Sequence, residues 1–245
     1  MPRTGRILID GGTYHVLTRG NNGQAVFHHD ADQQRYLQLL STYAKEHELK
    51  IFHFALMPNH VHLVLEVARG EALSKAMLGL NLSYALHFSR RYRYTGHVWQ
   101  GRFKSLAIDR ESYLLECGRY VELNPVRAGL VQDPARYPWS SYRVYAEGAS
   151  IPFLTLNPLY ESLGVSVNNR QHHYRQFIRD GMARQPVERV QLRQPIIVMS
   201  PPKPKSLESL LGLRRPGRPK KVLPAAAAGT IETSPFSITV LKNAK

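Results

Sequence analysis

The clearest pattern of hydrophobic and polar positions lies in residues 60–67, where strict alternation predicts a strand with two different faces. One face is wholly apolar and is expected to join the core; its residues are Val61, Leu63, Leu65 and Val67. The other face begins with His60 and His62, whose rings point to the same side because strand residues two apart share a face. The predicted strand therefore combines a core face with a pair of imidazoles.

Strands and helices alternate on either side of this strand. Further strands are expected at residues 14–19, 51–56 and, in a bent form, 96–108, and helices at 30–44, 71–93 and from Glu111 onward. Asp30 or Asp32 is expected to cap the first helix. The order of these elements predicts an α+β fold, namely a ferredoxin-like antiparallel sheet with helices and one extra C-terminal helix.

The pattern weakens along the second half of the chain. We expect residues 1–147 to form the main domain, residues 148–200 to form a partly helical extension with a helix at 168–182, and residues 201–245 to form a disordered basic tail rich in proline and alanine. Within this tail, Arg215 and Arg218 lie in a run of positive charges around a Gly-Arg-Pro core. Such a run resembles an AT-hook, which lays extended arginines in the minor groove of DNA, and it predicts at least a nonspecific, salt-sensitive affinity for DNA.

The helix that begins near Glu111 places Tyr120 on a polar stripe with Glu116 and Asn124, which lie four residues to either side. Beside it runs an apolar stripe formed by Leu114, Cys117 and Val121. A tyrosine phenol has a pKa of about 10 and needs a nearby metal or base before it can attack a phosphodiester. Two alternatives stay open: Tyr120 as an amphipathic residue at the edge of the core, and Asn124 as the N-cap of a short turn that starts with Pro125.

The histidine pair suggests a site for a metal ion, and the charge of the chain suggests a polyanionic partner. Two neutral imidazoles on one face can share a divalent metal ion, although the same pair is also compatible with a polar, solvent-facing strand. The 33 Lys and Arg residues outnumber the 18 Asp and Glu residues, for a net charge of +15, which predicts a polyanionic partner. The single cysteine, Cys117, excludes an internal disulfide and a multi-cysteine zinc site.

The chain contains no stretch of about 20 apolar residues and no signal peptide, so we expect no membrane span and a cytoplasmic, nucleoid-associated protein. Surfaces for nucleic acid are predicted in two places. Arg19, Asn21 and Asn22 follow the first strand and can either read bases or make a turn. The second place has Arg102 and Lys104 beside aromatic rings that include Trp99, and these rings can either stack on unpaired bases or fill the core.

Four motifs stand in the order in which one known family has them: Thr18–Asn22, Met57–His62, Val98–Phe103 and Tyr120–Leu130. On these motifs, over roughly residues 5 to 145, the chain resembles the tyrosine transposases of the HUH class. Within that class it is most similar to the REP-associated tyrosine transposases, where REP denotes a repetitive extragenic palindrome.

The resemblance implies roles for individual residues. It implies that His60 and His62 bind Mg²⁺ or Mn²⁺, that Asn124 supplies a third ligand, and that Tyr120 is the nucleophile. Relatives often have histidine where this chain has Glu122, a position that points away from Tyr120 on the helix. The departure leaves the expected roles of the other residues unchanged.

The function implied by the resemblance is a metal-dependent endonuclease and strand transferase for single-stranded DNA. It would act on hairpins of the REP type through a 5′-phosphotyrosine intermediate, as a monomer in preference to a dimer. One alternative is a protein that binds such hairpins without cleaving them. The other is a histidine-triad nucleotide hydrolase, which the chain disfavours because that class needs a third histidine where Val64 stands.

Overall fold

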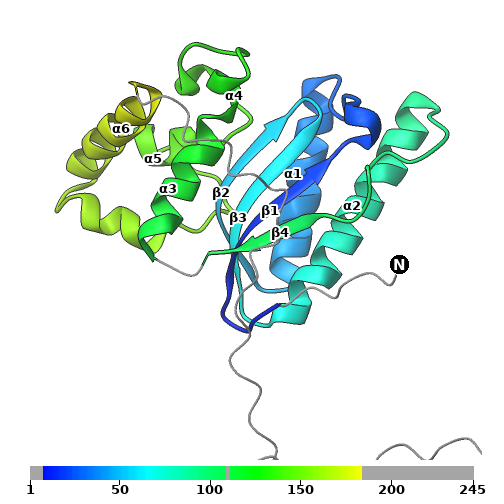
Figure 1. Ribbon diagram of the computed structural model, residues 1–245, viewed down its shortest axis with the longest axis horizontal. Helices are drawn as coiled ribbons and strands as arrows, with labels where there is room; N and C mark the ends of the chain where they lie inside the picture. The colour runs from blue at the N-terminus through cyan, green and yellow to red at the C-terminus, as the bar shows by residue number, and fades with distance from the viewer. Residues whose placement is uncertain (1–7, 109–110, 184–245) are drawn as a thin grey trace, which may run out of the picture. The chain divides into compact units, whose positions relative to one another are not determined.

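The computed structural model describes residues 8–108 and 111–183 of the chain. Its centre is a four-stranded antiparallel sheet with the strand order β2-β3-β1-β4. The strands are β1 (Thr13–Arg19), β2 (Leu49–Met57), β3 (His60–Val67) and β4 (Lys104–Ala107). The helices α1 (Asp30–Glu46) and α2 (Gly70–Tyr92) cover one face of this sheet, and α3 (Glu111–Glu122) lies on the other (Figure 1). This arrangement confirms the predicted ferredoxin-like α+β fold.

Both faces of β3 are covered, which the alternating pattern alone does not predict. The predicted core face joins the large hydrophobic cluster beneath α1 and α2, with Val61, Leu63, Leu65 and Val67 all almost inaccessible to solvent. On the opposite face Val64 packs in a second cluster with Leu114 and Val121 of α3. Because α3 covers this second face, His62 is only 3% exposed and does not lie on a solvent face.

The chain after α3 continues into short helical segments and one long helix. These are α4 (Asn124–Arg127), η2 (Pro134–Arg136), α5 (Tyr142–Glu147), η3 (Pro158–Leu163) and α6 (Val167–Ala183). The helix α6 confirms the one expected at residues 168–182. Residues of α5, η3 and α6 share a hydrophobic cluster with Leu123 at the end of α3, so the described part of the predicted extension packs around the helix that contains Tyr120.

The predicted basic tail, with its Arg215 and Arg218, lies outside the described residues.

Two local predictions need correction. The bent strand expected at residues 96–108 is a strand only at Lys104–Ala107, because the preceding segment bonds to the first loop instead: the Asn21 amide donates to the Val98 carbonyl at 2.9 Å. The N-cap of α1 is His29, and Asp32 accepts from the backbone amides of His28 and His29 from inside the first turn. A capping-box carboxylate in the first turn thus looks like an N-cap in sequence.

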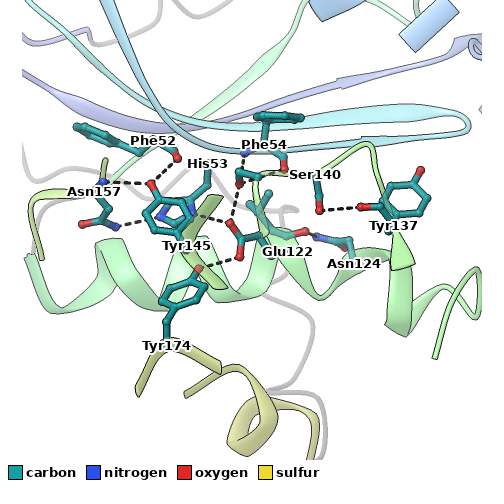
Figure 2. A network of polar contacts seen from close by, with 12 residues as sticks. Phe52, His53, Phe54, Glu122, Asn124, Tyr137, Ser140, Tyr145, Asn157 and Tyr174 are labelled. Carbon is teal, nitrogen blue, oxygen red and sulfur yellow. Dashed lines mark hydrogen bonds and ion pairs between the residues drawn. The ribbon is translucent and has the colours of Figure 1, made fainter. Parts of the chain in front are cut away.

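A buried polar network fixes α3 against β2, and Glu122 lies at its centre (Figure 2). One carboxylate oxygen of Glu122 contacts His53 Nδ1 at 2.9 Å and accepts from the Ser141 hydroxyl at 2.6 Å, while the other accepts from the Tyr174 hydroxyl at 2.7 Å. Asn157 Nδ2 lies 3.0 Å from His53 Nε2 on the far side of that ring. The network therefore joins α3 to β2, α5, α6 and the segment before η3.

The close approach of α3 to the sheet also depends on Gly118. A Cβ atom at this position would overlap the His53 ring, so any larger residue would push α3 away from β2. Farther along the same helix, the Arg119 guanidinium lies 4.3 Å from the centre of the Phe177 ring of α6. These contacts hold the backbone directly before Tyr120 in place.

A candidate active site between the histidine strand and α3

The candidate site lies between α3 and the strands β1 and β3, where the Tyr120 ring meets side chains of both strands. The register of the two strands pairs Leu17 with His62 and Arg19 with His60. Residues paired across an antiparallel sheet share a face, as do residues two apart on one strand. His15 therefore lies on the same face as the two predicted histidines, diagonally across from His62.

The structure brings three imidazoles and one phenol ring together. The ring centres of His60 and His62 are 4.9 Å apart. Tyr120 lies edge-on to both His62 and His15, with ring centres 5.9 Å apart in each case. The two predicted histidines and the predicted nucleophile thus form one cluster, and sequence reasoning did not identify His15 as part of it.

Hydrogen bonds set the tautomer of His60. Its Nδ1 lies 2.6 Å from the side-chain oxygen of Asn59, which can only accept, so Nδ1 bears the proton and Nε2 presents a lone pair. Asn59 is itself held in place, because its side-chain nitrogen donates to the Gly23 carbonyl at 3.0 Å. This arrangement leaves Nε2 of His60 as the atom able to bind a metal ion.

Burial keeps the three imidazoles in their neutral form. It lowers the pKa of His15 to about 4, and together with the positive charge of Arg19 it lowers the pKa of His60 to about 4. The pKa of His62 is lowered well below its ordinary value by burial and by the neighbouring His15 and His60. At neutral pH the rings therefore keep the lone pairs that metal binding requires.

The predicted third ligand, Asn124, begins α4 one turn after Tyr120. The backbone ladder breaks between α3 and α4 because Pro125, at the start of α4, has no N–H to donate to the preceding turn. Its side-chain nitrogen donates to the carbonyls of Tyr120 and Val121, at 2.9 and 3.2 Å, which leaves Oδ1 as the atom that could meet a metal.

The residues present are compatible with a divalent ion that takes most of its ligands from water and phosphate. Over the described part of the chain, no group of three or more His, Cys, Asp or Glu residues is placed to hold a metal ion. His60 and His62 offer two neutral nitrogens, and Asn124 offers an amide oxygen. Mg²⁺ and Mn²⁺ bind readily with water and phosphate oxygens in the remaining positions.

Arg127 is a second residue that sequence reasoning did not single out. Its guanidinium carbon lies 5.1 Å from the centre of the Tyr120 ring, and Nη1 donates to the Tyr120 carbonyl at 3.4 Å. Arg127 lies seven residues after Tyr120, and the short helix α4 folds it back over the ring. The contact places a positive charge beside the phenol.

A known protein family matches the part of the chain that contains this site. Residues 9–124 match the family described as "Transposase IS200 like". These residues form an IS200-like transposase domain. The matched range begins before β1 and ends at Asn124, so it contains His15, His60, His62 and Tyr120. A search of curated proteins found no match.

One solved structure shows a similar fold. A structure described as a "REP associates tyrosine transposase bound to a REP hairpin" matches with a TM-score of 0.51 at 20% identity, over 63% of this chain and 92% of that one. A putative transposase from Deinococcus radiodurans R1 matches with a TM-score of 0.36 at 16% identity, over 49% of this chain and 96% of that one. The first of these supports the same fold for the transposase domain.

The predicted DNA-binding residues of the transposase domain differ in their surroundings. Arg19 and Asn22 are exposed and Asn21 is partly exposed, and their loop lies next to His60 because the Gly20 amide donates to the Asn59 carbonyl at 2.8 Å. Arg102 and Lys104 are also exposed.

The surroundings of Trp99 favour its role in the core over base stacking. The ring packs against the main hydrophobic cluster, and Nε1 donates to the Asn81 carbonyl at 2.9 Å. The described part of the chain has no helix long and apolar enough to cross a membrane.

Proposed function

We propose that the protein is a metal-dependent endonuclease and strand transferase that attacks single-stranded DNA with Tyr120. The observation on which this rests is the placement of the Tyr120 ring beside His62, with ring centres 5.9 Å apart, in a cluster of neutral imidazoles. A tyrosine beside a site suited to a divalent ion is arranged for nucleophilic attack on a phosphodiester. Membership of residues 9–124 in a transposase family is consistent with this chemistry.

The proposed substrate is a DNA hairpin of the REP type. The net charge of +15 suits a polyanion, and exposed Arg19 lies beside the histidine cluster, where DNA phosphates would pass. The solved transposase of similar fold is bound to a REP hairpin. A single-stranded segment next to a hairpin stem would let its backbone reach Tyr120 without opening a duplex.

In the proposed reaction the Tyr120 oxygen attacks phosphorus and the bond from phosphorus to the 3′ oxygen breaks. The phosphate stays on Tyr120 as a 5′-phosphotyrosine, and the phenol proton leaves while the released 3′ oxygen takes up a proton. Mg²⁺ or Mn²⁺, held by His60, His62 and the Asn124 amide oxygen, would polarise the phosphate. Arg127 places its charge where the phenolate and the phosphate oxygens gather. Attack by a 3′ hydroxyl on the phosphotyrosine would complete strand transfer.

Adduct formation on hairpin DNA tests this proposal. The purified protein is mixed with single-stranded hairpin oligonucleotides of REP type and Mg²⁺ or Mn²⁺, and a denaturing gel then separates free from covalently bound DNA. We expect a protein–DNA adduct that forms only with metal. Tight hairpin binding without an adduct on any hairpin would instead support the alternative, a non-cleaving hairpin-binding protein.

His60→Ala and His62→Ala are each expected to reduce adduct formation by about 100-fold or more, because each removes one of the two nitrogen ligands. The rate is measured in single-turnover reactions over a range of Mn²⁺ concentrations, and raising Mn²⁺ should recover part of the loss. His172→Ala, which alters an exposed histidine of α6, should leave the rate unchanged. Full activity of both site variants without added metal would contradict metal binding by these histidines.

Arg127→Ala is expected to slow adduct formation by about 10-fold or more, since it removes a preorganised positive charge next to the nucleophile. Arg127→Lys should recover only part of the rate, because an ammonium group does not reproduce the planar fork of a guanidinium. Arg179→Ala removes an exposed arginine of α6 and controls for the change in net charge. Equal rates for Arg127→Ala and Arg179→Ala would show that Arg127 acts only through general attraction of DNA.

A further inference from the structure

His15 is a buried imidazole for which the proposed reaction has no use. It stands on β1, is 7% exposed, and its Nε2 lies 2.8 Å from Nδ1 of His62. A buried polar ring without a partner would destabilise the fold, and this contact gives one nitrogen of each ring a partner. The contact also uses one of the two nitrogens of a proposed metal ligand.

We propose that His15 is a positioning residue, which holds His62 in the tautomer and orientation that expose its Nε2 to a metal ion. This inference rests on the proposed function, because it assigns His15 a part in the metal site of that function. Histidines that bind metals in proteins usually donate their other ring N–H to a fixed acceptor, and this partner sets both the tautomer and the direction of the ring. Here the fixed acceptor is the ring of a second histidine.

Counting protons shows why the partner matters. One proton lies between Nε2 of His15 and Nδ1 of His62, because two neutral rings in one N–H···N bond share a single hydrogen. If His62 donates, its own Nε2 has a free lone pair and can bind metal. If His15 donates, the proton of neutral His62 is on Nε2 and blocks binding. Only the first arrangement is compatible with a metal ion.

The geometry holds the His62 ring in one direction. The planes of the two rings are 17° apart and their centres are 5.1 Å apart, as expected for rings joined edge to edge through one hydrogen bond. His15 itself comes from the central part of β1, where it pairs with Val64 of β3 and Leu106 of β4. A residue fixed on both sides by strand pairing is a rigid support for a ligand on the neighbouring strand.

Mn²⁺ affinity of the full-length protein without DNA tests this role, with free Mn²⁺ measured by electron paramagnetic resonance. His15→Phe keeps a planar ring but removes the acceptor, and we expect it to weaken Mn²⁺ binding by about 10- to 100-fold. His15→Gln offers a side-chain oxygen that can accept from Nδ1 of His62, and it should recover most of the affinity. Circular dichroism and thermal unfolding of each variant show whether it is folded.

Nitrogen NMR tests the same role in the unaltered protein, so the proposal does not depend on a variant that folds. In ¹⁵N-labelled protein loaded with Mg²⁺, we expect the proton of His62 on Nδ1. A proton on Nε2 of His62 in the loaded protein would overturn the proposal.

The possible results separate this inference from the proposed function. Equal Mn²⁺ affinity of the unaltered protein and folded His15→Phe would overturn the role of His15 and leave the metal site in place. If Mn²⁺ binding does not depend on His60 and His62, the metal site itself is overturned, and the role of His15 with it. Loss of adduct formation by His15→Phe at unchanged Mn²⁺ affinity would also overturn positioning, and would point to action on Tyr120, whose ring centre is 5.9 Å away.

Discussion

Tyr120→Phe is expected to abolish the covalent adduct with hairpin DNA, by about 1,000-fold or more, while hairpin binding stays within about twofold. The substitution removes only the phenol oxygen, which is the atom proposed to attack phosphorus. The ring keeps its contacts with His15, His62 and Arg127, because these involve the ring and the backbone carbonyl. Adduct formation is measured on denaturing gels and binding on native gels with the same labelled hairpin.

Tyr113→Phe is the matched control for this experiment. Tyr113 stands on the same helix, is 60% exposed, and lies two turns before Tyr120. We expect it to form the adduct at the rate of the unaltered protein. An adduct that persists in Tyr120→Phe would show that another residue is the nucleophile, and peptide mapping of the adduct would identify it.

The second large effect concerns stability: Glu122→Leu is expected to lower the free energy of unfolding by about 3–5 kcal/mol. Glu122 is fully buried and accepts from Ser141 and Tyr174 as well as contacting His53 (Figure 2). Leucine fills a similar volume but leaves these polar groups without a partner, and buried groups left unpaired are strongly destabilising. Urea unfolding followed by circular dichroism measures the change.

Two further variants serve as controls for Glu122→Leu. Glu122→Gln keeps an oxygen acceptor in the same place and should lose less stability than Glu122→Leu. Glu71→Leu removes an exposed carboxylate that pairs with the equally exposed Lys75, and it should change stability by less than about 1 kcal/mol. A loss below about 1 kcal/mol in Glu122→Leu would contradict a network that holds α3 in place.

The network also connects stability to the candidate site. Tyr120 lies two residues before Glu122, so a shift of α3 at Glu122 moves the Tyr120 ring relative to the histidines. Glu122→Leu should therefore slow adduct formation even under conditions in which most of the protein is folded. The prediction that position 122 points away from Tyr120 agrees with this arrangement, since its partners lie on β2, directly before α5 and on α6, and not at the histidine cluster.

Local patterns were enough for the elements that form the site. Alternation in residues 60–67 placed His60 and His62 on one face of a strand, and the spacing of apolar residues placed Leu114, Cys117 and Val121 on the packed side of α3. Both predictions succeed because the pleat of a strand and the pitch of a helix set directions over a few residues. The end of α3 was harder to place, since the break at Leu123 depends on the proline that follows Asn124.

Where sequence left alternatives open, tertiary packing favoured one of them. Trp99 was equally compatible with base stacking and with the core, and the surrounding rings of Tyr36 and Tyr84, together with the Asn81 carbonyl, favour the core. A polar, solvent-facing second face of β3 was one open alternative, yet α3 covers that face, because residues more than 40 positions later in the chain pack there. No window of sequence contains both partners of such a contact.

The sequence by itself determined that His60 and His62 share one face of a strand and that Tyr120 lies on the polar stripe of a helix. Only the tertiary structure decided that His15 meets His62, that Glu122 meets His53 and Tyr174, and that Arg127 lies over Tyr120. The physical reason is that periodicity acts along a single segment, whereas these contacts depend on strand register, on the crossing of α3 over the sheet and on the turn into α4.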